Sequence, residues 1–85
     1  MNILHGKIQS VHTEGTADFK KQILTLSVSS EERCFIEVRS EILRDILKKL
    51  KKGDKVKTVV SFEGKISKSN GNRFNNLVAK TLEKL

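Results

Sequence analysis

The stretch Arg33–Leu85, RCFIEVRSEILRDILKKLKKGDKVKTVVSFEGKISKSNGNRFNNLVAKTLEKL, decides the fold. Residues 33–38 alternate between apolar and polar side chains as a short strand does, and an apolar stripe at helical spacing follows them. A long strand, a polar turn at residues 69–72 and a last strand from Arg73 complete the stretch. A strand, a capped helix and a hairpin in this order predict the second half of a small five-stranded β-barrel.

The predicted helix has clear signals at both ends. Ser40 is a suitable N-cap, and Glu41 lies where the helix dipole favours a negative charge. Lysines crowd the C-terminal end, and Gly53 is predicted to form a left-handed cap. The apolar stripe consists of Ile42, Leu43, Ile46, Leu47 and Leu50. We expect this helix to close one end of the barrel rather than to bind a ligand.

Five strands are predicted along the chain, separated by turn residues. They span residues 3–11, 20–29, 33–38, 54–65 and 73–82. Gly6 is expected to mark a bend or bulge in the first strand, and residues 13–18 are expected to form the first loop. Asn70-Gly71 predicts a hairpin turn, because both residues tolerate positive φ.

The period-2 alternation predicts which strand residues face the core. The predicted core residues are Leu24, Leu26, Val28, Cys34, Ile36, Val38, Val56, Thr58, Val60, Phe62, Leu77 and Ala79. Phe35 is left pointing outward among charged side chains. Phe74 and Val78 fall on the face opposite to Leu77 and Ala79, and either a bulge or a partner subunit would resolve that conflict.

Length and composition predict a single domain over residues 1–85. Cys34 is the only cysteine, so the chain has no internal disulfide and no cysteine-histidine cluster for a structural metal, and a reduced cytoplasmic setting is expected. No apolar run approaches the roughly 18 residues of a membrane span, and the N-terminus lacks the apolar segment of a signal peptide. We therefore expect no membrane-spanning segment. Binding to a membrane surface is not expected either, because the chain lacks a basic amphipathic helix with bulky aromatic side chains.

The positive charge is concentrated in the second half of the chain. The formal net charge is +7; residues 1–43 hold five Lys or Arg against six Asp or Glu, whereas residues 44–85 hold twelve against four. A basic half on a small domain favours a polyanionic partner, with a merely solvated surface as the alternative. Charge alone does not distinguish nucleic acid from an anionic membrane surface.

Five strands with one helix between the third and the fourth is the order of the oligonucleotide/oligosaccharide-binding (OB) fold. Residues 34–38, 50–56, 62–66 and 70–74 resemble the middle of bacterial single-stranded DNA-binding proteins. Residues 6–8, 19–22, 52–54 and 73–79 are similar, in the same order, to a family of short, largely uncharacterised bacterial OB-fold proteins. The resemblance implies an OB fold and a DNA-binding-like role. It also implies tryptophans at the positions of Phe19, Arg39, Arg73 and Lys80, which this chain lacks.

Capture of a single strand needs cations for the phosphates and aromatic platforms for the bases. The chain has no Trp or Tyr, so the candidate platforms are Phe35, Phe19 and Phe74, and Arg39 could stack in place of a lost ring. The phosphate candidates are Lys20, Lys21, Arg39, Lys55, Lys57, Lys65, Lys68, Arg73 and Lys80. The sequence therefore predicts non-catalytic, salt-sensitive binding of single-stranded DNA, with RNA also possible.

The sequence also bears on other classes of function. An enzyme is not expected, because His5 and His12 have no nucleophile in a triad context, glycine-rich phosphate loops are missing and no cofactor is implied. A protein-interaction module is the serious alternative: Ile23, Val59 and Val78 on outward faces would suit a homo-oligomer, either a dimer or a tetramer.

Overall fold

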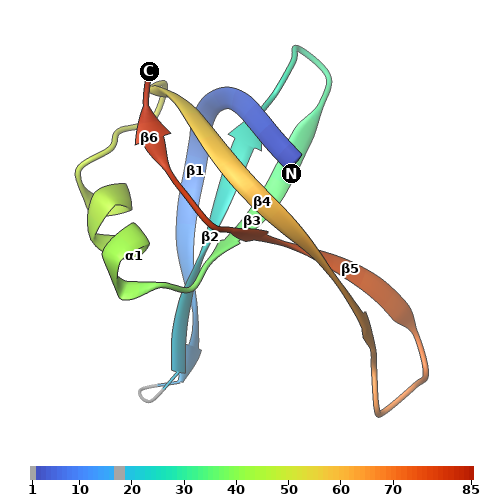
Figure 1. Ribbon diagram of the computed structural model, residues 1–85. Coiled ribbons are helices and arrows are strands. Elements are labelled where there is room, and N and C mark those ends of the chain that lie inside the picture. Colours follow the sequence, from blue (N-terminus) through green and yellow to red (C-terminus); the bar gives the residue numbers. More distant parts are fainter. Residues whose placement is uncertain (1, 17–18) are drawn as a thin grey trace.

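The computed structural model describes residues 2–16 and 19–85 and is mainly β-sheet (Figure 1). Its elements are β1 (Asn2–Thr16), β2 (Phe19–Ser27), β3 (Arg33–Val38), α1 (Glu41–Lys48), β4 (Lys55–Ile66), β5 (Arg73–Ala79) and β6 (Glu83–Lys84). The sheet order is β1-β2-β3-β5-β4-β6, and an additional β1–β4 pairing closes five of the strands into a ring. This confirms the predicted five-stranded OB architecture with one helix between β3 and β4. The short β6, which pairs with the start of β4, was not predicted.

The long strand β1 closes the ring because it pairs with two neighbours in turn. Residues 2–7 pair with β4, and residues 7–16 pair with β2. The register shifts between Ile8 and Ser10, so the bulge lies after Gly6 and the prediction of a bulge at Gly6 was wrong. The predicted loop at residues 13–18 was also wrong in its first part, since residues 13–16 continue the ladder with β2. The side chains there are polar because this part of the β1–β2 hairpin packs against no core. Its sequence therefore resembles that of a loop.

Gly6 is needed because neighbouring atoms approach it closely. A Cβ atom at this position would lie 2.5 Å from the Ser27 carbonyl oxygen and 2.8 Å from Leu26 Cγ. Both distances are shorter than any ordinary contact of a real Cβ. The absence of a side chain therefore lets β1 approach the end of β2 closely at this point.

One hydrophobic core fills the ring and continues under the helix. It consists of Ile8, Leu24, Leu26, Ile36, Val38, Leu43, Leu47, Val56, Val60, Ala79 and Leu82. Cys34, Val28 and Leu77 are partly buried against it, as the alternation predicted. Thr58 is fully buried, and its hydroxyl donates a 2.7 Å hydrogen bond to the Thr81 carbonyl, so this polar group is satisfied inside the core.

The helix closes the ring through Leu43 and Leu47, which are buried in the common core. Ser40 is the N-cap and accepts a 3.4 Å hydrogen bond from the Leu43 backbone N–H. Two predictions about this helix were wrong. Ile42 is 73% exposed, because the face that contacts the ring is narrower than the apolar stripe. Gly53 has a positive φ of 93°, but it lies in the turn before β4, beyond the C-cap Lys49.

The β4–β5 hairpin extends past the core. β1 pairs with β4 only as far as Val60, and from Ser61 onward β4 pairs with β5 alone. Phe62 keeps the orientation of Val60 but is 60% exposed, so its predicted place in the core was wrong. The alternation was correct; no other strand covers that face of the hairpin. At its tip, residues 67–72 form the turn, and Gly71 has a positive φ of 72°.

Candidate functional site

The outer face of β2 and β3 lies between two projecting hairpins. In Figure 1 the β1–β2 hairpin and the β4–β5 hairpin both end at the lower side of the view, one to each side. In the OB fold this face and these two hairpins form the usual ligand-binding region. Since alternate residues of β2 and β3 are buried in the core, the outer face carries Lys21, Ile23, Phe35, Glu37 and Arg39.

Phe35 is an accessible ring on this face, as the sequence predicted. It is 63% exposed and lies opposite Thr25 of β2 in the ladder. Beside it, β3 and β5 pair only at Ile36↔Leu77 and Glu37↔Val78, so their N-terminal halves diverge. A groove of about 340 Å³ occupies this gap, lined by Ile23, Arg33, Cys34, Phe35, Glu37, Asn75, Asn76 and Leu77. The ring of Phe35 therefore borders a recess with amide groups on its other wall.

Two of the predicted phosphate contacts are engaged in an ion-pair network. Lys21 Nζ lies 2.7 Å from Glu37 Oε1, and Arg39 Nε donates to Glu37 Oε2 at 2.8 Å. Arg39 Nη1 also reaches Glu63 Oε2 on β4 at 3.1 Å. The network balances two cations with two carboxylates, so it contributes no net charge to the face.

Glu37 is the centre of this network and is only 7% exposed. Burial alone would raise its pKa, but hydrogen bonds from Lys21 and Arg39 and their positive charges outweigh burial and hold the pKa below its ordinary value. Burial likewise opposes the charge of Arg39, yet Glu37 and Glu63 raise the pKa of that guanidinium. Glu37 and Arg39 are therefore charged at neutral pH. Lys21 and Arg39 are both held by carboxylates.

The network also explains the burial of Val78. This residue pairs with Glu37 of β3 and with Ser61 of β4, and it points away from the core that contains Ala79. It is nevertheless only 3% exposed. Because β5 lies between β3 and β4 in the sheet, the side chain of Arg39 must cross β5 to reach Glu63. We infer that this crossing shields Val78, so neither a bulge nor a partner subunit is needed to bury it.

The β4–β5 hairpin carries cations that, unlike Lys21 and Arg39, are not held in the ion-pair network. Lys65, Lys68 and Arg73 are exposed, and none of them forms an ion pair within residues 2–16 and 19–85. Phe74, 46% exposed, lies opposite Lys65 in the ladder. A second groove, of about 360 Å³, is lined by Gly64, Lys65, Ile66, Arg73, Phe74 and Asn75. Exposed rings and uncompensated positive charge therefore occur together on this hairpin.

The other predicted site residues are more scattered. Lys20 is exposed near the start of β2, opposite Gly15 of β1. Phe19 begins β2, but its side chain lies outside the described part of the structure. Lys80 is exposed directly after β5, and its backbone N–H donates to the Val59 carbonyl at 2.7 Å.

Lys55 and Lys57 lie at the opposite end of β4 from the hairpin. Lys55 pairs with Lys7, and Lys57 pairs with His5, both on β1. Lys57 Nζ also lies 3.7 Å from a Glu83 carboxylate oxygen. With a rise of about 3.3 Å per residue, Lys55 is separated from Lys65 by as much as ~33 Å of strand. The fold does not bring these two lysines to the face that carries Phe35.

Sequence reasoning missed residues that shape this region. Glu37 and Glu63 neutralise predicted phosphate contacts, and Asn75 and Ile66 line grooves. The pairing of Glu37 with Arg39 could have been predicted from the sequence, because residues two apart along a strand lie on the same face. The pairing of Glu63 with Arg39 could not have been predicted in this way, since it depends on the insertion of β5 between β3 and β4.

The described residues contain no group of three or more side chains suited to a metal ion. Among the described helices, none is long and apolar enough to cross a membrane. A comparison with models of known protein families finds none that matches this chain, and a comparison with curated proteins finds no match either.

Proposed function

We propose that this chain binds single-stranded nucleic acid, most simply DNA, without catalysing a reaction. One observation supports this above the others: exposed Phe35 and Phe74 lie on the outer face of neighbouring strands, and Phe74 is paired with the uncompensated cation Lys65. Aromatic platforms beside free cations are what base stacking and phosphate attraction require. The resemblance to bacterial single-stranded DNA-binding proteins supports the same proposal and a cytoplasmic setting.

The cations divide into two classes in this proposal. Lys65, Lys68 and Arg73 on the hairpin, with Lys20, make the first contacts with phosphates, because none of them is held by a carboxylate of residues 2–16 and 19–85. Lys21 and Arg39 contribute little, since a phosphate would have to displace Glu37 or Glu63. With three or four phosphates neutralised, log K should fall with log salt at a slope of about −2 to −3.

The experiment is a fluorescence anisotropy titration of labelled oligo-dT at 50 and 200 mM salt. The variant Lys65→Gln/Arg73→Gln should flatten the salt slope by about 1.4, because two phosphate contacts are lost. Phe35→Ala/Phe74→Ala should weaken binding at both salt concentrations, by about 1–3 kcal/mol for each stacked base.

Matched controls come from exposed residues outside the face. Lys51→Gln/Lys52→Gln removes the same charge from the turn between α1 and β4, and Ile42→Ala removes an exposed apolar side chain from the helix. Both controls should bind almost as the parent does. Binding that is undetectable at low salt, or equal losses in the hairpin and control variants, would refute the proposal.

A second function, self-assembly into a dimer or tetramer, is favoured by a different observation. Phe62 and Ile66 are 60% and 64% exposed and share the face of the hairpin that carries Arg73 and Leu77, opposite to the face of Phe74. A partner copy would bury these side chains. Light scattering coupled to gel filtration tests this: Phe62→Ser/Ile66→Ser should give a monomer where the parent is an oligomer. A monomeric parent would exclude this second function.

A further inference from the structure

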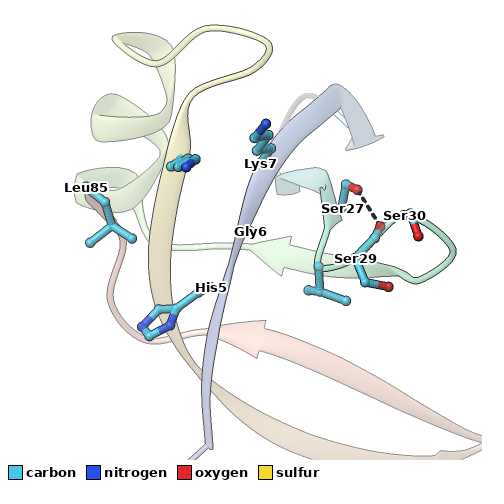
Figure 2. A pocket seen from close by; sticks show the side chains of 9 residues that line it. His5, Gly6, Lys7, Ser27, Ser29, Ser30 and Leu85 are labelled. Carbon is cyan, nitrogen blue, oxygen red and sulfur yellow. Dashed lines mark hydrogen bonds between the residues drawn. The ribbon is translucent and has the colours of Figure 1, made fainter.

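A third depression lies away from the two grooves described above. Figure 2 shows it between β1, the turn after β2 and the end of the chain, with His5, Lys7, Ser27, Ser29, Ser30 and Leu85 around it. Gly6, Val28 and Lys55 complete its lining, and its volume is about 460 Å³. It shares no lining residue with the grooves beside Phe35 and Phe74.

Two lysines face each other across the strands of this depression. Lys7 of β1 and Lys55 of β4 are direct partners in the antiparallel ladder, and both are exposed. Within residues 2–16 and 19–85, neither forms an ion pair, and no carboxylate side chain lines the depression. Like charges directly opposite one another destabilise a sheet. A bound anion would remove this repulsion.

The neighbouring pair of residues on these two strands differs, because it has a carboxylate beside it. His5 and Lys57 are the next outward partners on the same two strands, and Lys57 has Glu83 of β6 within 3.7 Å. In the part of the chain that the structure describes, Lys7 and Lys55 have no carboxylate within ion-pair distance. The positive charge of the depression is therefore uncompensated where the lysines meet.

Hydroxyl groups form the opposite wall. The turn after β2 is held by hydrogen bonds from the Val28 N–H to the Glu32 carbonyl at 3.0 Å and from the Ser27 hydroxyl to the Ser29 carbonyl at 3.1 Å. Ser29 also accepts from the Glu32 N–H at 3.1 Å. The Ser30 hydroxyl makes no hydrogen bond to the described residues. The turn thus has an ordered backbone and a free hydroxyl donor.

We propose that this depression binds a phosphate monoester. The phosphate would lie between Lys7 and Lys55, whose two positive charges match its two negative charges, and Ser30 would donate to one of its oxygens. Val28 and Leu85 offer apolar contact to the organic part of the ligand. A continuous strand is a poorer occupant, because each of its diesters carries one charge and no Phe, Tyr or Trp side chain lines the depression. This site does not depend on the nucleic-acid proposal.

The test is an NMR titration of the ¹⁵N-labelled chain with thymidine monophosphate, 5′-phosphorylated dT₁₀ and unphosphorylated dT₁₀. Amides of Gly6, Lys7, Ser30 and Lys55 should shift with either monoester and not with the unphosphorylated strand. Shifts from the free nucleotide identify a small molecule as the source of the monoester. Shifts from the phosphorylated strand alone identify a strand end.

The variant Lys7→Gln/Lys55→Gln should weaken the monoester interaction by about tenfold for each lysine lost. It should also melt no lower than the parent, since the repulsion is removed, so a loss of binding cannot be attributed to unfolding. Lys51→Gln/Lys52→Gln is the charge-matched control and should retain the shifts.

Three results would overturn the site: no shifts at these amides with either monoester at millimolar concentration, equal shifts in the lysine variant, or equal shifts with unphosphorylated dT₁₀. The Lys65→Gln/Arg73→Gln variant separates this site from the nucleic-acid proposal. It should lose affinity for oligo-dT while keeping the response to thymidine monophosphate.

Discussion

Replacing Glu37 by Gln perturbs the buried centre of the ion-pair network with almost no change of volume. The parent carboxylate accepts from Lys21 Nζ at 2.7 Å and from Arg39 Nε at 2.8 Å. The amide keeps one acceptor oxygen but turns an N–H₂ group toward cations. A hydrogen bond to a charged group contributes about 1.5–3 kcal/mol. Because the side chains of Lys21 and Arg39 are about one-third exposed, water replaces part of the loss, and we expect about 2 kcal/mol of destabilisation.

The pH dependence gives this prediction a second, independent readout. The pKa of Glu37 is lower in the folded chain than its ordinary value of 4.5. Its contribution to stability is therefore complete above pH 4.5 and is lost as the pH falls through the lower, folded-state pKa. The difference in unfolding free energy between the parent and Glu37→Gln should be largest at neutral pH and should shrink below pH 4.5.

Urea denaturation followed by circular dichroism, repeated from pH 7 to pH 3, measures both quantities. A change of about 2 kcal/mol corresponds to about 8–16 °C in melting temperature for a domain of this size. Glu31→Gln, at an exposed position of the turn after β2, is the control and should change stability by less than about 0.5 kcal/mol. A Glu37 variant as stable as the parent at pH 7, or a difference that does not change with pH, would refute the reasoning.

The remaining predictions concern the scaffold and are measured by the same denaturation assay. Gly6→Ala should destabilise by about 1–3 kcal/mol, since its methyl group meets the Ser27 carbonyl; no loss would contradict the close approach of the strands. Ser40→Ala should lower the free energy of unfolding by about 1 kcal/mol through loss of the N-cap, whereas Ser40→Asp should keep most of the parent's stability. Leu24→Ala should cost about 2–5 kcal/mol, but Phe62→Ala should cost well under 1 kcal/mol, and equal losses would mean that Phe62 is buried.

The alternation of strand residues predicted most of the fold. Leu24, Leu26, Ile36 and Val38 face the core as expected, because local pattern and global packing agree inside the ring. The same rule failed for Phe62, since alternation gives the direction of a side chain but not whether another strand covers it. The alternation of residues in β4 does not predict where its neighbour β1 stops pairing with it.

The candidate site was less predictable than the fold. The exposure of Phe35 followed from the alternation of residues in β3, and the position of the β4–β5 hairpin followed from strand order. The neutralisation of Arg39, however, depends on Glu63, which lies in a strand not adjacent to β3. Lys55 and Lys65 belong to one strand and share one face of it. Their separation follows from the length of β4 and from its pairing with β1 at one end and β5 at the other.

The change of partner along β4 has a consequence for how this chain can diversify. The first half of β4, as far as Val60, contributes Val56 and Val60 to the core, so substitutions of these core residues would change the stability of the fold. The residues beyond Val60 pair only with β5 and bury little, so they can change without unfolding the ring. Relatives that share this architecture should therefore vary most in the second half of β4 and the first half of β5. The part of the chain that carries the proposed nucleic-acid contacts can then change over generations while the scaffold stays constant.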